Sequence, residues 1–274
     1  MKIEIEKVLR DKNPRLARFT PRFLLNYLRR IVHEREINEV LEQCEGLRGA
    51  DFARKALSIA GIGYTARGLE SLDGRGRYLF VSNHPFGGMD GMMLIDLIEA
   101  RFSDVRVVVN DLLMNIAPLS PIFIPVNKHG RQNDLYARNF NDAFGSDIPI
   151  LTFPAGLVSR RIGGRVTDLD WRPSFVKRAV ASRRDIVPVY IDGRLSDFFY
   201  RLASVRKKLG IKANIEMLYL ADEMFRQRGS RFEILFGEPV PWQTLCSGAS
   251  AAATAAEIRK RVYELGTRSG SAPR

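Results

Sequence analysis

From residue 78 onward, short apolar runs alternate with longer segments whose apolar residues recur at helical spacing. The apolar runs are 78–82, 105–109, 121–126, 148–153, 185–191 and 232–237, and the helical segments are 90–101, 131–145, 174–183, 196–209 and 214–227. Because the runs are almost continuously apolar, we expect strands that are covered on both faces. The pattern predicts an α/β fold with a mixed, mostly parallel sheet flanked by helices.

Two terminal segments flank this core, and we expect one domain overall. Residues 1–70 are predicted to be helical, with Thr20 and Pro21 as a helix start followed by an amphipathic segment. That segment is expected either to pack on the core or to contact a membrane, and the sequence favours neither. Residues 71–246 form the predicted α/β core. Residues 247–274 are predicted to form a peripheral helix and a tail.

Composition narrows the range of functions. With 45% hydrophobic and 27% charged residues, a soluble globular protein is expected rather than a disordered one. Cys44 and Cys246 are too few for a disulfide framework and have no metal-ligand spacing. The first 19 residues lack the apolar centre of a signal peptide, and no window approaches 18 apolar residues, so we expect neither export nor a membrane span. The net charge of +12 predicts a polyanionic partner.

The stretch SNHPFGGMDG, residues 82–91, combines a histidine, two glycines and an aspartate between an apolar strand and an apolar helix. His84 can act as a general base because its ordinary pKa is near neutrality. Asp90 can orient the imidazole, and Gly87 and Gly88 let the backbone fold back. No serine or cysteine nucleophile stands in a suitable position beside His84, which favours direct attack by a substrate hydroxyl. The alternative is that Asp90 caps a helix and His84 is an ordinary turn residue.

Four blocks widen the pattern: NHPFGGMDG, PIFIPVNK, FPAGLVSRR and IVPVYIDG, in this order over about 110 residues. Together they resemble the glycerolipid acyltransferase family, that of lysophosphatidic acid acyltransferase, across residues 75–240. The resemblance implies that His84 takes a proton from an acceptor hydroxyl and that Asp90 orients it. It also implies that Lys128 and Arg160 lie near the acceptor and that Pro188 shapes a pocket. The predicted substrate-binding residues are Asn83, Gly87, Gly88, Lys128, Pro154, Gly156, Arg160 and Pro188.

Several of these residues have plainer alternatives. Pro188 could only mark a bulge, and Lys128 and Arg160 could be solvated surface charges. The chain also departs from the family in two places. Five residues separate His84 from Asp90 where the family has four, and Ala155 replaces the glutamate of the third block. That block helps to hold the glycerol-phosphate acceptor in the family. An acceptor without phosphorus, such as an acylated amino acid with a free hydroxyl, is therefore the alternative to a lysophospholipid.

The expected mechanism uses no metal and no cofactor beyond the acyl donor, which is acyl-carrier protein or a coenzyme A thioester. Backbone N–H groups of Gly156 or of the Gly87–Gly88 segment are expected to hold the oxyanion. Because a lyso-lipid resides in a bilayer, we expect the enzyme to act in membrane phospholipid synthesis as a peripheral protein. We place it on an anionic surface, the cytoplasmic face of the inner membrane, with residues 14–32 and 198–209 as candidate contacts.

Three other functions are alternatives to acyl transfer. An esterase on an α/β sheet needs a G-x-S-x-G turn, which the sequence lacks. A nucleic-acid-binding protein would explain the basic charge, but no zinc-finger or RNP-like motif accompanies it, so no nucleic acid is expected. A non-catalytic lipid-binding protein with the same fold stays open on the sequence alone.

Overall fold

The computed structural model describes residues 2–12, 14–126, 134–246 and 248–268. Within these residues a seven-stranded sheet has the order β1-β9-β8-β2-β5-β3-β4. Its strands are β1 Gly63–Arg67, β2 Tyr78–Ser82, β3 Arg106–Asn110, β4 Phe123–Val126, β5 Ile150–Thr152, β8 Asp185–Ile191 and β9 Arg231–Phe236. Every neighbouring pair is parallel except β8 and β9, which are antiparallel. The predicted mixed, mostly parallel sheet is confirmed.

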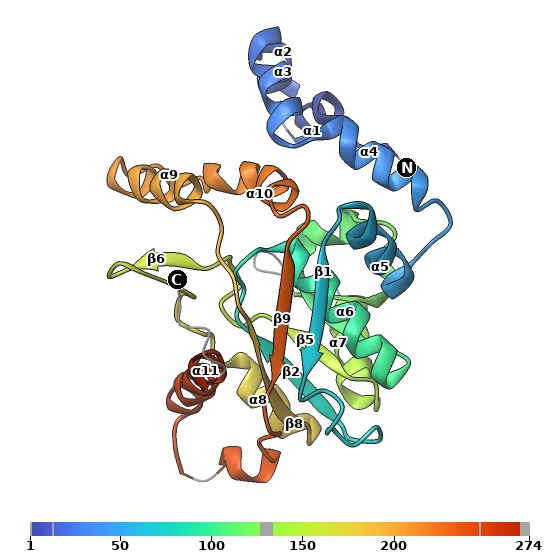
Figure 1. Cartoon of the computed structure of the whole chain (residues 1–274), viewed down its shortest axis with the longest axis vertical. Helices are drawn as coiled ribbons and strands as arrows, with labels where there is room; N and C mark the ends of the chain where they lie inside the picture. The colour runs from blue at the N-terminus through green and yellow to red at the C-terminus, as the bar shows by residue number, and fades with distance from the viewer. Residues whose placement is uncertain (1, 13, 127–133, 247, 269–274) are drawn as a thin grey trace.

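Helices cover both faces of the sheet (Figure 1). One face packs against α5 Gly49–Ile59 and α6 Gly88–Phe102, and the other packs against α7 Asp134–Gly145, α8 Ser174–Ser182 and α11 Ala251–Arg268. Successive residues of β2 point to opposite faces, so Phe80 joins the first core and Leu79 and Val81 join the second. Burial on both sides explains why the strands are almost continuously apolar in sequence.

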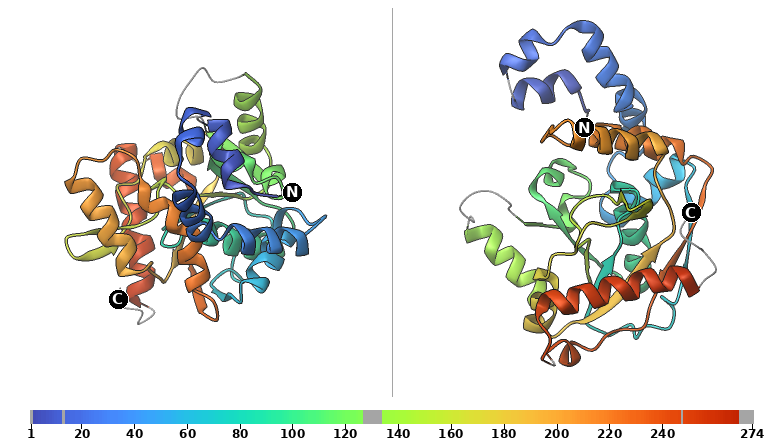
Figure 2. Two further views of the ribbon diagram at one scale, coloured as in Figure 1. Left: turned by 90° about the horizontal axis from the view of Figure 1, so that it is seen from above. Right: turned by 90° about the vertical axis from the view of Figure 1, so that its left-hand side faces the viewer.

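The first four helices form an arm that extends from one end of the molecule, as Figures 1 and 2 show. This N-terminal arm consists of α1 Ile5–Lys12, α2 Pro14–Phe19, α3 Arg22–Ile31 and α4 Glu34–Gln43. α3 and α4 are separated at His33, which has a left-handed backbone with φ of +53°. The helices therefore change direction at this residue.

A second group of helices lies between the arm and the sheet. This cap consists of α9 Asp197–Lys208, the 3-10 helix η3 Ile215–Tyr219 and α10 Leu220–Arg226. Nε2 of His33 lies 3.0 Å from Oδ1 of Asp222, and the His33 ring packs on Phe225 with centroids 4.5 Å apart. The hydroxyls of Tyr27 and Tyr219 are hydrogen-bonded to each other. These contacts attach the arm to the cap rather than to the sheet.

Two structural features lie outside the elements expected from the sequence. The core sheet begins before residue 71, because β1 pairs with β9 and α5 packs on α6. A small antiparallel hairpin, β6 Arg160–Ile162 with β7 Arg165–Thr167, follows β5. Both are short and only partly buried, so they lack the apolar runs that identify the inner strands.

Among the described residues, no helix combines the length and the apolarity that crossing a bilayer requires.

Candidate active site

The candidate site forms where the middle of the sheet ends. β2 lies between β5 and β8 and runs parallel to both, so the loops after β2 and β5 meet at one edge. The loop after β2 carries His84, and the loop after β5 carries the third sequence block, FPAGLVSRR. Backbone N–H of Ser159 donates to the carbonyl of His84 at 2.8 Å, which joins the two loops directly. Open α/β sheets bind ligands at such carboxyl ends.

His84 and Asp90 are in contact. Nδ1 of His84 lies 2.9 Å from Oδ2 of Asp90. The ring and the carboxylate do not meet with the alignment of a hydrogen bond, so the contact is a close approach of the carboxylate to Nδ1. The His84 ring stacks on Phe153 with centroids 4.2 Å apart, and its side chain is 18% exposed. Nε2 has no hydrogen-bond partner among the described residues, which leaves this nitrogen to meet a substrate.

Asp90 is fully buried at the start of α6. Its Oδ2 accepts hydrogen bonds from the backbone N–H groups of Phe86 at 2.9 Å and Gly87 at 3.0 Å. Desolvation raises the pKa of the Asp90 carboxyl, while His84 and the two amides oppose this rise. As the third residue of the helix, Asp90 also lies where the helix dipole favours a negative charge. The capping role considered from the sequence and the contact with His84 therefore occur together.

The loop after β2 is held by a second buried carboxylate, Asp168. Its Oδ1 accepts from the backbone N–H of His84 at 3.2 Å and from Oγ of Ser159 at 2.6 Å. Its Oδ2 accepts from Nε1 of Trp171 at 2.9 Å. One side chain thus fixes both loops of the site relative to each other. Asp168 was not predicted from the sequence, because TDLDW matches no short motif with a known spacing.

Asn83 performs a backbone-like role beside the histidine. Its side-chain amide donates to the carbonyl of Ile191 at 2.9 Å and accepts from the N–H of Ile191 at 2.8 Å. This pairing continues the β2–β8 ladder by one residue. Both polar groups of the buried Asn83 side chain are therefore engaged in positioning the loop.

The glycines differ in what their amides can do. Gly87 adopts φ of +84°, which an L side chain rarely tolerates, and its N–H is bound to Asp90. Gly156 has φ of +65°, and its N–H donates to the carbonyl of Phe153 at 2.9 Å. Gly88 is the first residue of α6, where an amide has no acceptor within the helix. Of the predicted oxyanion donors, the Gly88 amide is therefore the one that has no acceptor within residues 2–12, 14–126, 134–246 and 248–268.

The remaining predicted residues fall into different environments. Pro154 is buried, and its carbonyl accepts from the N–H of Arg172 at 3.2 Å. Pro188 lies inside β8 opposite a bulge. Ile186 pairs with Val240 and Val189 pairs with Phe236, so the segment 236–240 has one residue more than the stretch of β8 that it faces. The missing N–H of Pro188 is tolerated at such a bulge. Lys128 lies outside the described residues.

Arg160 begins β6 and turns toward the cap. Its Nη2 donates to Oε1 of the buried Glu216 at 3.0 Å. The expectation of a solvated surface charge is wrong for this residue, because only 11% of its side chain is exposed. Glu216 was not identified from the sequence, since its partner is 56 residues away and no local pattern connects the two.

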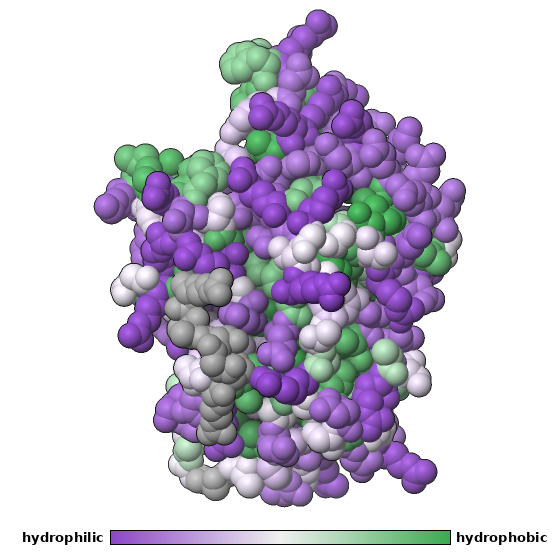
Figure 3. Space-filling model, in the orientation of Figure 1, coloured by the Kyte–Doolittle hydropathy of each residue, from purple (hydrophilic) through white to green (hydrophobic). Residues whose placement is uncertain are grey.

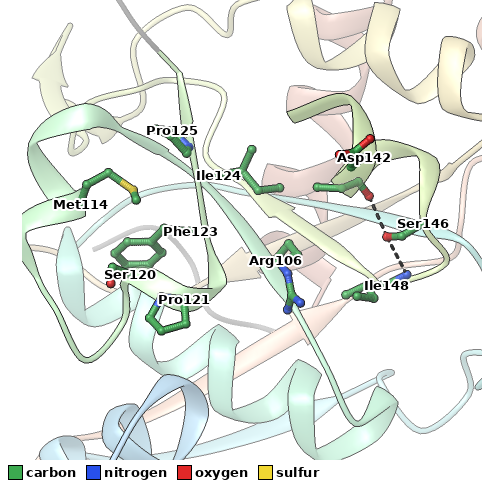
Figure 4. Close-up of a pocket in the computed structure, with 11 residues that line it drawn as sticks. Arg106, Met114, Ser120, Pro121, Phe123, Ile124, Pro125, Asp142, Ser146 and Ile148 are labelled. Carbon is green, nitrogen blue, oxygen red and sulfur yellow. Dashed lines mark hydrogen bonds between the residues drawn. The ribbon is translucent and has the colours of Figure 1, made fainter. Parts of the chain in front are cut away.

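A separate cavity of about 430 Å³ lies at the edge of the sheet (Figure 4). Arg106 and Phe123, the first residues of β3 and β4, line it together with Asp142 of α7. Because these strands run parallel to β2, the cavity is near their amino ends, whereas His84 follows a carboxyl end. We therefore do not assign the reaction to this cavity.

Comparisons with known proteins bear on this geometry. A family model described as Acyltransferase matches residues 7–270. A lyso-glycine lipid O-acyltransferase of Bacteroides thetaiotaomicron is 42% identical over 264 residues, covering 96% of this chain and 97% of the relative. The chain belongs to this acyltransferase family. A lyso-glycine lipid O-acyltransferase of Phocaeicola vulgatus is 43% identical, covering 96% of this chain and 95% of that relative.

This acyltransferase also resembles a solved structure. The 1-acyl-sn-glycerophosphate acyltransferase of Thermotoga maritima aligns with a TM-score of 0.48 and 16% identity, covering 80% of this chain and 78% of that chain. The resemblance inferred from the four sequence blocks is confirmed by the family model and by the relatives. The protein is an enzyme that transfers acyl groups.

Proposed function

We propose that this acyltransferase moves a fatty acyl group from a thioester to the free hydroxyl of a lyso-lipid, and that the acceptor is an acylated glycine. The His84–Asp90 pair carries the proposal, because Nε2 of His84 has no hydrogen-bond partner in the described part of the chain. The names of the two relatives support the acceptor. The replacement of the family's glutamate by Ala155 left two acceptors open, a lysophospholipid and a lyso-lipid without phosphorus. The names of the relatives favour the lyso-lipid without phosphorus.

In the proposed reaction, Nε2 of His84 takes the proton from the acceptor hydroxyl while the oxygen attacks the thioester carbonyl. Asp90 stabilises the imidazolium that forms. The N–H of Gly88 is placed to donate to the oxyanion of the tetrahedral intermediate. When the C–S bond breaks, the thiolate leaves and takes the proton from His84. The balance is one ester formed, one thioester broken and one proton moved to sulfur.

The serines nearest to His84 support direct transfer rather than an acyl-enzyme. Oγ of Ser82 is buried within β2, and Oγ of Ser159 donates to Asp168. Neither hydroxyl is within a hydrogen bond of the His84 ring, so neither is activated as a nucleophile. This also argues against the hydrolase considered from the sequence.

The donor in this proposal is acyl-carrier protein or a coenzyme A thioester. Both are anionic, and the net charge of +12 favours their approach over long range. No cofactor is needed in either case, because the thioester already supplies the activated acyl group.

We also propose that the enzyme works as a peripheral protein on an anionic membrane, the cytoplasmic face of the inner membrane. Large apolar side chains stand exposed on the arm and on α9, where Phe19, Phe23 and Leu209 are 77%, 75% and 70% exposed. Figure 3 shows apolar surface at the tip of the arm and over α9 among hydrophilic residues. These two apolar patches lie at the end of the molecule that carries the arm and the cap. This arrangement suits an acceptor that stays in the bilayer.

The test is a transfer assay with purified protein. An acyl-carrier-protein thioester and acyl-coenzyme A are each offered with an N-(hydroxyacyl)glycine, with lysophosphatidic acid and with an N-acylglycine that lacks the hydroxyl. Mass spectrometry should detect a diacylated glycine product only from the hydroxylated glycine. Absence of that product with either donor would contradict the proposal, and equal use of lysophosphatidic acid would contradict its acceptor.

A further inference from the structure

A buried carboxylate joins the cap to the active-site loops. Glu216 of η3 is fully buried, with Oε1 3.0 Å from Nη2 of Arg160 and Oε2 2.8 Å from Nε of Arg206. Arg160 belongs to β6 and Arg206 belongs to α9. A carboxylate between two guanidinium groups leaves the cluster with one net positive charge, which is expensive to bury unless every group has partners.

The guanidinium of Arg160 has most of its donors committed. Nη1 donates to the carbonyls of Val158 at 2.6 Å and Ser159 at 3.3 Å, and Nη2 donates to Glu216. The face of the group lies over the Phe199 ring, 5.3 Å from its centroid. Burial lowers the pKa of Arg160, and the charge of Glu216 opposes that change. A guanidinium is the preferred protein partner for a phosphate, but this one is already paired.

The cluster adjoins the candidate catalytic loop. Ser159, the residue before Arg160, donates its N–H to the carbonyl of His84 at 2.8 Å. On the cap side, the Leu220 side chain lies 3.4 Å from the position that a Cβ on Gly87 would take. An acceptor whose hydroxyl reaches His84 therefore brings its neighbouring groups close to the segment that carries Arg160. In lysophosphatidic acid one of those groups is a phosphate on the adjacent carbon.

We propose that Glu216 is a specificity-determining residue, which retains Arg160 in an internal ion pair and thereby disfavours acceptors with a phosphate headgroup. A phosphate placed beside these loops would lose its hydration without gaining the bidentate arginine contact that could replace it. An acceptor without phosphate avoids that cost. The inference rests on the proposed acyl transfer to a lyso-lipid and extends it to the choice of headgroup.

Two variants separate the release of Arg160 from a change of charge. Arg206→Met removes one guanidinium but keeps the Arg160–Glu216 pair. Glu216→Gln combined with Arg206→Met releases Arg160 and keeps the net charge of the cluster at one positive unit, as in the wild type. Thermal melting of both variants checks that they fold. If the double variant melts below the assay temperature, Arg206→Gln replaces Arg206→Met, since a glutamine can still donate to the Ile211 carbonyl that Arg206 contacts.

The measurement is the ratio of kcat/KM for lysophosphatidic acid to kcat/KM for the N-(hydroxyacyl)glycine. Arg206→Met should leave this ratio at the wild-type value. The double variant should raise it by about tenfold or more, since one good contact to a charged group discriminates to that extent. Glycerol 3-phosphate should also inhibit the double variant more strongly than the wild type.

Three outcomes would overturn the inference. An unchanged ratio in a folded double variant means that Glu216 does not control headgroup choice. An equal loss of both activities means that Glu216 only holds the cap in place. A wild-type enzyme that uses neither acceptor removes the proposed function and this inference together, whereas the first two outcomes leave the proposed function intact.

Discussion

Nδ1 of His84 lies 2.9 Å from Oδ2 of Asp90 although five residues separate them in sequence. Two features make room for the additional residue. Gly87 takes a positive φ of +84°, and α6 begins directly afterwards at Gly88, so Asp90 lies in the first helical turn. The carboxylate then faces back over the loop and contacts the imidazole. The contact between His84 and Asp90 therefore forms although the spacing between them is one residue longer than is usual in the family.

Replacement of His84 tests the proposed general base. His84→Ala should lower kcat by about two to four orders of magnitude, because proton transfer by a positioned base contributes that much. The fold should persist, since the His84 side chain is partly exposed and the Asp90 carboxylate that it contacts keeps its hydrogen bonds from two backbone amides. Steady-state assays and melting curves measure the two effects. A folded His84→Ala enzyme with wild-type turnover would exclude the mechanism.

Replacement of Asp90 should separate activity from stability. In Asp90→Asn, an amide oxygen in the place of Oδ2 still accepts from the N–H groups of Phe86 and Gly87 and still faces Nδ1 of His84, but it carries no negative charge. The imidazolium that forms during the reaction then lacks its stabilising carboxylate, so His84 is a weaker base. Turnover should fall by at least about tenfold, yet less than in His84→Ala. A pH profile of kcat/KM whose acidic limb is unchanged in the variant would argue against this role.

The stability of Asp90→Asn should depend on pH in a defined direction. Because the pKa of Asp90 is raised in the folded protein, the folded state holds the proton more tightly than the unfolded state. The favourable contribution is complete below about pH 4, the ordinary value for the unfolded chain, and is lost as pH rises through the folded pKa. Asp90→Asn should therefore match or exceed the wild-type Tm at pH 7 to 8. A variant that melts well below the wild type at neutral pH would contradict this sign.

Asp168 should matter for both stability and turnover. Asp168→Ala leaves the N–H of His84, Oγ of Ser159 and Nε1 of Trp171 without their acceptor. Losing such partners costs about 1 to 3 kcal/mol each, so the free energy of unfolding should fall by about 3 kcal/mol or more. The matched control is Asp170→Asn, at an exposed residue nearby. It should change the free energy of unfolding by less than about 0.5 kcal/mol. Urea titrations that give equal values for the two variants would refute the bracing role.

Much of the fold was predictable because strands that are buried on both faces consist of consecutive apolar residues. β2 and β8 were expected at the residues where they occur, since both are covered on two faces and consist almost wholly of apolar residues. β1 could not be found in this way. It is an edge strand with the sequence GYTAR, and all five of its residues are partly or fully exposed. Its position in the sheet depends on pairing with β9, which is far along the chain.

The site was predictable to the extent that its chemistry is local. His84 and Asp90 are close in sequence, so loop, helix start and residue types together indicated their contact. Asp168 and Glu216 act across distances of many residues, and each is a single acidic residue in an unremarkable segment. Their burial and partners are set by tertiary packing, which no spacing rule reports. The same holds for the pairing of Asn83 with Ile191, which the sequence did not predict.

The proposed membrane surface makes the last prediction. Arg22 and Arg30 are exposed in the first and last turns of α3, and Arg22 directly precedes the exposed Phe23. Each basic residue near an anionic surface contributes about 1 kcal/mol, so Arg22→Gln with Arg30→Gln should weaken binding to anionic vesicles by about thirtyfold at low salt. The control is Lys260→Gln with Arg261→Gln on α11, which removes the same charge from a part of the molecule distant from the arm (Figure 1).

Vesicle flotation at several salt concentrations distinguishes the two pairs. Binding of the wild type should weaken as salt rises, because exposed charges are screened within about 10 Å at 0.1 M salt. The α3 variant should show a shallower salt dependence, whereas the α11 variant should follow the wild type. Equal loss of binding in both variants would mean that net charge matters and position does not. Binding that is the same for neutral and anionic vesicles would reject the electrostatic contribution of the arm, because its arginines would then add nothing to the affinity.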